Sequence, residues 1–211
     1  ILEDYTHCML NNLNAKFNKR NVFMSLRKFT GLPFGGWTNI KENINTLNNE
    51  KILKKEKIIY KFLNQKKTYI KNESEFSLKL KNKFLKLNKD NEILLDKNIL
   101  NYPIPKISNN ILSCYNWKII RKKRIENWKY LNKNLKNKFD VFPKKIQDKV
   151  CPLYFIIITT KRDQIRNHLI SKRIFVANSW KKISDLNYRN LTKSIFLFKN
   201  ILYIPLDQRL E

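Results

Sequence analysis

The alternation of hydrophobic and polar positions predicts short strands near both ends of the chain and helices between them. Residues 22–26 form a short apolar run that predicts a strand, and the continuous apolar run at 152–158 predicts another. Residues 41–71 carry apolar side chains at loosely helical spacing, and residues 76–94 repeat them in steps of three and four. This succession of elements is typical of an α/β protein.

The segment after residue 107 predicts a helix with one apolar face. Ser108 is a suitable N-cap, and the apolar positions run from Ile111 to Leu135 before Pro143 ends the segment. The basic cluster 121–124 lies in the middle of this helix. Such a cluster is typical of a solvated helix face, and phosphate binding is the alternative.

The C-terminal third changes to an alternation of strands and a helix. After the strand at 152–158, residues 162–173 predict a helix, and 174–176 and 201–204 predict two further strands in a βαβ order. His168 lies on the predicted helix with no chemical partner nearby in the sequence, which favours a structural role.

The prolines at 103 and 105 interrupt a long stretch without proline or glycine. They predict a domain boundary, with residues 1–101 in one domain and 102–211 in another that opens with a long interdomain helix. The chain begins without a methionine or a signal peptide and stops just after a predicted strand, so we expect it to be a piece of a longer protein.

The charge of the chain is strongly positive, +27 from 44 Lys and Arg against 17 Asp and Glu. A charge of this size favours a polyanionic partner such as nucleic acid or an anionic membrane surface. The lysines are spread over the sequence, however, as an A/T-rich coding bias would also produce. We therefore expect weak, non-specific adhesion to polyanions rather than a specific nucleic-acid function.

The sequence also disfavours a membrane span, a metal site and a disulfide framework. The longest apolar run is far shorter than the roughly 18 residues that a membrane span needs. The three cysteines, Cys8, Cys114 and Cys151, lack metal-ligand spacing, which favours isolated core thiols in a reducing, cytoplasmic compartment over a metal site or a disulfide framework.

All three glycines of the chain lie between residues 31 and 36, whereas average usage would give about fifteen in a chain of this length. Glycine is needed where φ is positive or where the backbone approaches another group closely. Lys28 lies three residues before the first glycine, at the end of a predicted strand. This arrangement favours a reactive amine held beside a tight loop, although an abundant residue such as lysine is also found as an exposed solubilising group.

An acidic residue completes this candidate site. Asp4 ends the apolar start of the chain, and the end of a strand in an α/β sheet is where ligands bind; a helix cap or turn residue is the alternative for Asp4 alone. His7 follows three residues later. A carboxylate and an amine are what pyridoxal phosphate requires, the amine to attach the cofactor and the carboxylate to keep its ring nitrogen protonated.

Several short blocks follow one another in a fixed order along the chain: Ile1–His7, Ser25–Lys28, Gly35–Gly36, Arg124–Leu131, Arg162–Asp163, Leu169–Ile170, Ile174–Val176, Trp180 and Pro205–Arg209. In this order they resemble the DegT/DnrJ/EryC1/StrS family of pyridoxal-phosphate-dependent aminotransferases, which have fold type I and mostly build aminosugars for surface polysaccharides and antibiotics. The resemblance covers nearly the whole chain and corresponds to the C-terminal half of such an enzyme.

The resemblance implies a role for four residues. Lys28 corresponds to the Schiff-base lysine, and Asp4 to the partner of the pyridine nitrogen. His7 stands near the ring's 3-oxygen, and Ser25 contacts the phosphate. Residues 1–101 would then finish the large cofactor-binding α/β/α domain, and 102–211 would form the small α/β domain. The family's glycine–threonine turn and stacking aromatic precede the part that this chain resembles.

The function implied is a cytoplasmic, homodimeric aminotransferase with pyridoxal 5'-phosphate as cofactor. An amino donor such as glutamate would leave its nitrogen on the cofactor, and a nucleotide-linked keto sugar would accept it. Two alternatives stay open: a basic nucleic-acid-binding protein, and an inactive relative with a structural or interaction role.

Overall fold

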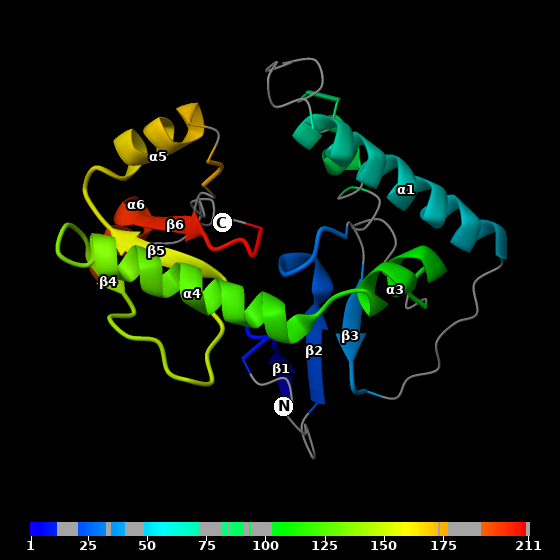
Figure 1. Cartoon of the computed structure of the whole chain (residues 1–211), viewed down its shortest axis with the longest axis horizontal. Helices are drawn as coiled ribbons and strands as arrows, with labels where there is room; N and C mark the ends of the chain where they lie inside the picture. The colour runs from blue at the N-terminus through cyan, green and yellow to red at the C-terminus, as the bar shows by residue number, and fades with distance from the viewer. Residues whose placement is uncertain are drawn as a thin grey trace. The chain divides into compact units, whose positions relative to one another are not determined.

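The computed structural model describes residues 1–11, 21–32, 35–40, 49–71, 82–83, 85–90, 93, 103–172, 174–176 and 191–209. Over these residues the protein is a mixed α/β structure with two small sheets (Figure 1). It divides into two compact units, one formed by Ile1–Met9 with Ala15–Tyr115 and the other by Leu10–Asn14 with Asn116–Glu211. The predicted boundary between residues 101 and 102 lies outside the described residues.

The first unit contains a three-stranded sheet in the order β1–β2–β3. Strand β1 (Leu2–Asp4) pairs in parallel with β2 (Asn21–Ser25), which pairs antiparallel with β3 (Gly36–Thr38). Both predicted strands, the one that ends at Asp4 and the one that leads to the glycines, are therefore present. Because β1 and β2 run in the same direction, their carboxyl ends lie at the same edge of the sheet.

Strand β2 shows the alternation of a half-buried strand. Val22 and Met24 are buried, whereas Phe23 between them is exposed. The strand leads into the one-turn helix η1 (Leu26–Lys28), after which Phe29 is almost fully buried.

Helix α1 (Asn49–Lys71) confirms most of the helix predicted at 41–71 and buries Ile59. In the segment predicted as a second helix, residues 82–83, 85–90 and 93 are helical.

Helix α3 (Lys106–Ser113) begins two residues before Ser108, so the predicted cap at this serine is wrong. Ser108 lies inside the helix, fully buried, and its hydroxyl has no hydrogen-bond partner. Pro105 occupies the N-cap position without a side-chain hydrogen bond. Instead, Glu56 of α1 accepts a hydrogen bond from the Ile107 amide at 3.2 Å, which places a carboxylate at the positive end of the helix.

The second unit combines one long helix with an antiparallel sheet in the order β4–β5–β6. Its packed centre joins Trp128 to residues of all three strands, with Trp128 and Phe155 in tilted contact at a ring-centroid distance of 5.8 Å. The elements are α4 (Trp117–Leu135), β4 (Asp140–Phe142), β5 (Tyr154–Ile158), α5 (Arg162–Ser171), α6 (Thr192–Asn200) and β6 (Ile201–Pro205).

Three predictions for this part of the chain are corrected. The single helix from Ser108 to Leu135 is two helices, because the Asn116 side chain accepts a hydrogen bond from the Ile119 amide at 3.1 Å and starts α4 anew. Residues 174–176 are not a strand, although Val176 is buried in the core. Strands β5 and β6 run antiparallel, so the tail is not a parallel βαβ unit.

No helix in the described part of the chain is long and apolar enough to cross a membrane.

Neighbouring isoleucines on α4 provide a matched test of how this helix is oriented. Ile120 is 7% exposed and Ile119 is 58% exposed. We expect Ile120→Ala to lower the free energy of unfolding by about 2–4 kcal/mol because it removes buried apolar contacts, and Ile119→Ala to change it by less than about 0.5 kcal/mol. Urea unfolding followed by circular dichroism measures both. Equal effects would contradict the orientation of α4.

Candidate functional site

The carboxyl ends of β1 and β2 are joined through Thr6. The Tyr5 amide donates to the Phe23 carbonyl at 2.8 Å and continues the strand pairing by one residue. The Thr6 amide donates to Oδ1 of Asp4 at 2.8 Å, and the Thr6 hydroxyl oxygen accepts from the Ser25 amide at 3.1 Å. One threonine therefore connects Asp4, at the end of β1, with Ser25, at the end of β2.

Thr6 also controls the ionisation of Asp4. Hydrogen bonds from the hydroxyl and then the amide of Thr6, together with the charge of His7, lower the pKa of Asp4 below its ordinary value despite a small opposing effect of burial. The side chains of both Asp4 and His7 are exposed. At neutral pH this edge of the sheet therefore presents an ionised carboxylate to solvent.

Lys28 lies in η1, immediately after β2. The Leu26 carbonyl accepts hydrogen bonds from the amides of Phe29, at 3.3 Å, and Thr30, at 3.1 Å, and a third from the Thr30 hydroxyl at 2.9 Å. Because Phe29 is only 1% exposed, it fixes the turn against the core. Lys28 itself is exposed, so its amine extends from a well-anchored turn.

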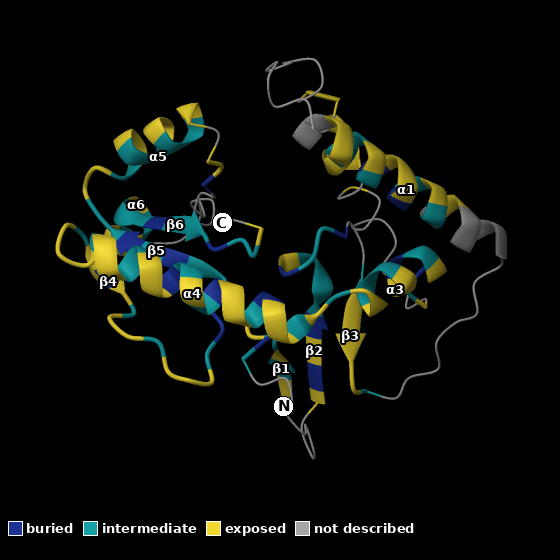
Figure 2. Ribbon diagram, in the orientation of Figure 1, coloured by how far each residue is buried: buried dark blue, intermediate teal, exposed yellow. Residues whose placement is uncertain are grey.

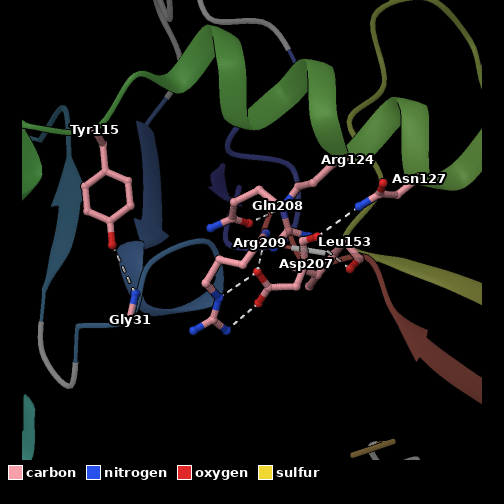
Figure 3. A network of polar contacts seen from close by, with 8 residues as sticks. All are labelled: Gly31, Tyr115, Arg124, Asn127, Leu153, Asp207, Gln208 and Arg209. Carbon is pink, nitrogen blue, oxygen red and sulfur yellow. Dashed lines mark hydrogen bonds and ion pairs between the residues drawn. The ribbon is translucent and has the colours of Figure 1, made fainter. Parts of the chain in front are cut away.

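The glycines close this turn onto the sheet. Gly35 has a φ of 123°, which L-residues with a side chain rarely adopt, and its carbonyl accepts from the Leu26 amide at 3.1 Å. A Cβ at Gly36 would lie 3.3 Å from the Met24 carbonyl oxygen. Gly31 donates to the Tyr115 hydroxyl at 3.4 Å, one of the contacts drawn in Figure 3.

The structure thus places Asp4, His7 and Ser25 at or just beyond the ends of two neighbouring parallel strands, with Lys28 three residues after Ser25. Thr6, the residue that links them, was missed by sequence reasoning. The available signal was its position two residues after an aspartate, where a hydroxyl and an amide commonly bond to the preceding carboxylate.

A second polar network lies in the second unit, on α4. Arg124 donates from Nε to Gln208 Oε1 at 3.1 Å and from one terminal nitrogen to the Leu153 carbonyl at 3.2 Å (Figure 3). One turn later, Asn127 donates to the Asp207 carbonyl at 2.9 Å. These bonds attach the segment after β6 to the helix.

Arg124 corrects the expectation that the cluster 121–124 is a solvated face. Arg124 is only 5% exposed, whereas Lys122 and Lys123 are exposed as expected. Arg121 also has a structural role, because its guanidinium donates hydrogen bonds to the carbonyls of Leu10 and Asp148. The cluster therefore divides between two structural arginines and two solvated lysines.

Burial and ion pairing shift the pKa values of Arg124 and Asp207 in this network. Burial lowers the pKa of Arg124, although its guanidinium remains charged at neutral pH. Burial alone would raise the pKa of Asp207, but hydrogen bonds and charge from Arg209, with a contribution from Arg124, lower it below its ordinary value. The carboxylate and Arg209 form a bidentate pair, with Nε–Oδ1 at 2.8 Å and Nη2–Oδ2 at 2.6 Å.

The three cysteines are all free, but only one is a core thiol. Cys8 and Cys114 are exposed, so the expectation of core thiols is wrong for these two. Cys151 is buried, and its amide donates to Asn11 Oδ1 at 2.8 Å. Burial raises the pKa of its thiol to about 11, against the smaller effect of Arg124 and Arg121.

Among the described residues, no group of three or more His, Cys, Asp and Glu side chains could hold a metal ion. A hollow on the surface of α6 is lined by Thr192, Lys193, Phe196 and Leu197. None of these four is a predicted site residue, and all belong to one helix and the turn that begins it. The described part of its lining therefore comes from a single helix.

Comparison of the chain with protein-family models, with curated proteins and with solved structures found no match.

The glycines of the Lys28 turn provide a matched pair of substitutions. Gly35→Ala should lower the free energy of unfolding by about 1–3 kcal/mol because its φ of 123° is strained for alanine and the new Cβ would lie 3.1 Å from Ile104 Cδ1. Gly31→Ala should be within about 0.5 kcal/mol of neutral, because its nearest obstacle is the flexible end of Lys66. Urea unfolding separates the two; similar costs would contradict the turn geometry.

The cysteines predict a definite pattern of thiol reactivity. At pH 8, Ellman's reagent should modify Cys8 and Cys114 readily and leave Cys151 unmodified, because a thiol that is buried and has a pKa of about 11 supplies almost no accessible thiolate. Unfolding in guanidinium should release the third thiol. Mass spectrometry of peptides from partly modified protein identifies the sites, and early modification of Cys151 would contradict its placement.

Proposed function

We propose that this chain is the C-terminal half of a pyridoxal-phosphate-dependent aminotransferase of the family that its sequence blocks resemble. The observation that carries the proposal is the parallel pairing of β1 and β2. It puts the Asp4 carboxylate and the Ser25–Lys28 turn at the same edge of one sheet. Open α/β sheets bind their ligands at the carboxyl ends of strands.

The chemistry of the available side chains fits the cofactor. The cofactor requires an amine for attachment, an anion beside its ring nitrogen and hydrogen-bond donors for its phosphate. Lys28 offers an exposed amine. Asp4 offers a carboxylate whose lowered pKa keeps it ionised, and the half-buried Ser25 offers a hydroxyl.

When bound, pyridoxal phosphate would supply an electron sink that stabilises negative charge on the substrate carbon. Asp4 would accept a hydrogen bond from the protonated ring nitrogen and stabilise its positive charge. Lys28 would hold the cofactor through its amine, and Nζ of Lys28 would carry the proton that is removed from the substrate carbon. Ser25 would donate to the phosphate, and His7 would approach the 3-oxygen of the ring.

The proposal includes the finer points that follow from the resemblance. The fold would be type I, with residues 1–101 finishing the large domain and 102–211 forming the small one. The enzyme would be a cytoplasmic homodimer that takes its amino group from a donor such as glutamate. The acceptor would be a nucleotide-linked keto sugar, and positive charge would favour binding of its diphosphate.

Lys28→Ala gives the direct test, with Lys61→Ala as the control because Lys61 is an exposed lysine on α1. Wild type mixed with pyridoxal phosphate should develop the visible absorption band of a lysine-bound cofactor. Borohydride should then fix the cofactor on the peptide that contains Lys28. The band should disappear in Lys28→Ala and remain in Lys61→Ala. Asp4→Asn should weaken binding because it removes the charge beside the ring nitrogen.

Two results would overturn the proposal. One is the absence of any band with both the 211-residue chain and the longest natural form of the protein that contains it. The other is borohydride labelling spread evenly over many lysines and unchanged in Lys28→Ala, which would show that the cofactor reacts only with accessible amines.

A further inference from the structure

The exposed side of α4 carries a row of lysines that the spread of lysine through the sequence concealed. Successive residues of an α-helix are separated by about 100° around its axis, so five lysines fall within about 60° of one another. All five residues are exposed. We call this row the lysine ridge; its members are Lys118, Lys122, Lys129, Lys133 and the C-cap residue Lys136.

The packing of the helix fixes the direction of this ridge. Trp128 and Arg124, which are 3% and 5% exposed, lie on the opposite side of α4, where Leu131 and Leu135 also pack against the core. Figure 2 shows the alternation of buried and exposed residues along the helix. Rotation of α4 that buried the ridge would expose Trp128 and break the hydrogen bonds of Arg124.

Little negative charge opposes the ridge on its own helix. Between residues 117 and 136 the one acidic residue is Glu126, whose carboxylate lies 3.9 Å from the Lys122 amine. An exposed pair of this kind contributes little stability and is easily exchanged for another partner. Lys118 and Lys136 are 18 residues apart, about 27 Å along the helix, so the ridge presents an extended line of positive charge.

We propose that the lysine ridge binds the sugar–phosphate backbone of single-stranded nucleic acid without regard to sequence. Charge complementarity with a regular line of phosphates is one argument. The second is Tyr130, which is 70% exposed and adjoins the ridge on the next strip of the helix surface, where its ring is available to stack on a base. An anionic membrane fits less well, because Trp128, Leu131 and Leu135 are packed in the core and cannot enter a bilayer.

This inference is independent of the proposed aminotransferase. It uses only residues of the second unit, none of which is a proposed cofactor contact. Nucleic-acid binding could therefore fail without affecting the result of the cofactor experiment, and the reverse is equally true.

The test compares two variants of identical net charge, four units below the +27 of the wild type. The ridge variant carries Lys118→Gln, Lys122→Gln, Lys129→Gln and Lys133→Gln. The scattered variant changes four exposed lysines elsewhere: Lys67→Gln, Lys106→Gln, Lys161→Gln and Lys199→Gln. Glutamine has nearly the helix propensity of lysine, and circular dichroism verifies that both variants are folded.

Fluorescence anisotropy with a labelled oligodeoxythymidine of about 20 nucleotides, at several salt concentrations, measures affinity. The ridge variant should bind at least about ten-fold more weakly than wild type, and the slope of log affinity against log salt should fall by about 3. The scattered variant should lose less than about three-fold. Tyr130→Ala should weaken binding about five-fold or more because it removes a stacking surface.

Three outcomes would overturn the inference. Equal losses in the ridge and scattered variants would show binding by diffuse charge. An unchanged affinity in Tyr130→Ala would remove the argument for single strands. Ridge-dependent binding to phosphatidylserine vesicles, without binding to the oligonucleotide, would assign the ridge to a membrane surface instead.

Discussion

The parallel pairing of β1 with β2 is the interaction on which the candidate site depends. Asp4 pairs with Phe23, and the bonds from Tyr5 to Phe23 and from Ser25 to Thr6 extend the pairing to the end of both strands. A shift of the register by one residue would turn the Asp4 side chain to the other face of the sheet. An antiparallel pairing would move Asp4 to the opposite end of β2. Only the observed arrangement places an ionised carboxylate beside the turn that carries Lys28.

Helix α4 has a comparable role in the second unit, because its orientation both fills the core on one side and exposes lysines on the other. Its inner side fills the core with Trp128, and the buried guanidinium of Arg124 holds the backbone near Leu153 and the side chain of Gln208. A buried charge is tolerated only when it is hydrogen-bonded, so these contacts restrict the rotation of the helix. The same restriction directs the lysine ridge to solvent. The rotation of α4 about its axis thus determines both the packing of the core and the position of the surface charge.

Elements with a clear local pattern were predictable from the sequence: β2, β5, β6 and α5 lie close to their expected positions. Features that depend on distant residues were not. Glu56 caps α3 from another helix, which no local pattern near Ser108 reveals. The direction of β6 relative to β5 is likewise a tertiary property. The burial of Arg124 could have been predicted from the sequence, since Arg124 precedes the inward-facing Trp128 by four residues and therefore lies on the same face of the helix. The roles assigned to Lys28, Asp4, His7 and Ser25 remain predictions.

The measurement that tests the central claim most directly is the nuclear Overhauser pattern between β1 and β2 in a deuterated sample of the chain. Parallel pairing predicts cross-strand contacts of Leu2 with Asn21 and of Asp4 with Phe23, followed by contacts between Thr6 and Ser25. Contacts of Leu2 with Phe23 and of Asp4 with Asn21 would indicate an antiparallel pair. That result would separate Asp4 from the Lys28 turn and contradict the account of the site.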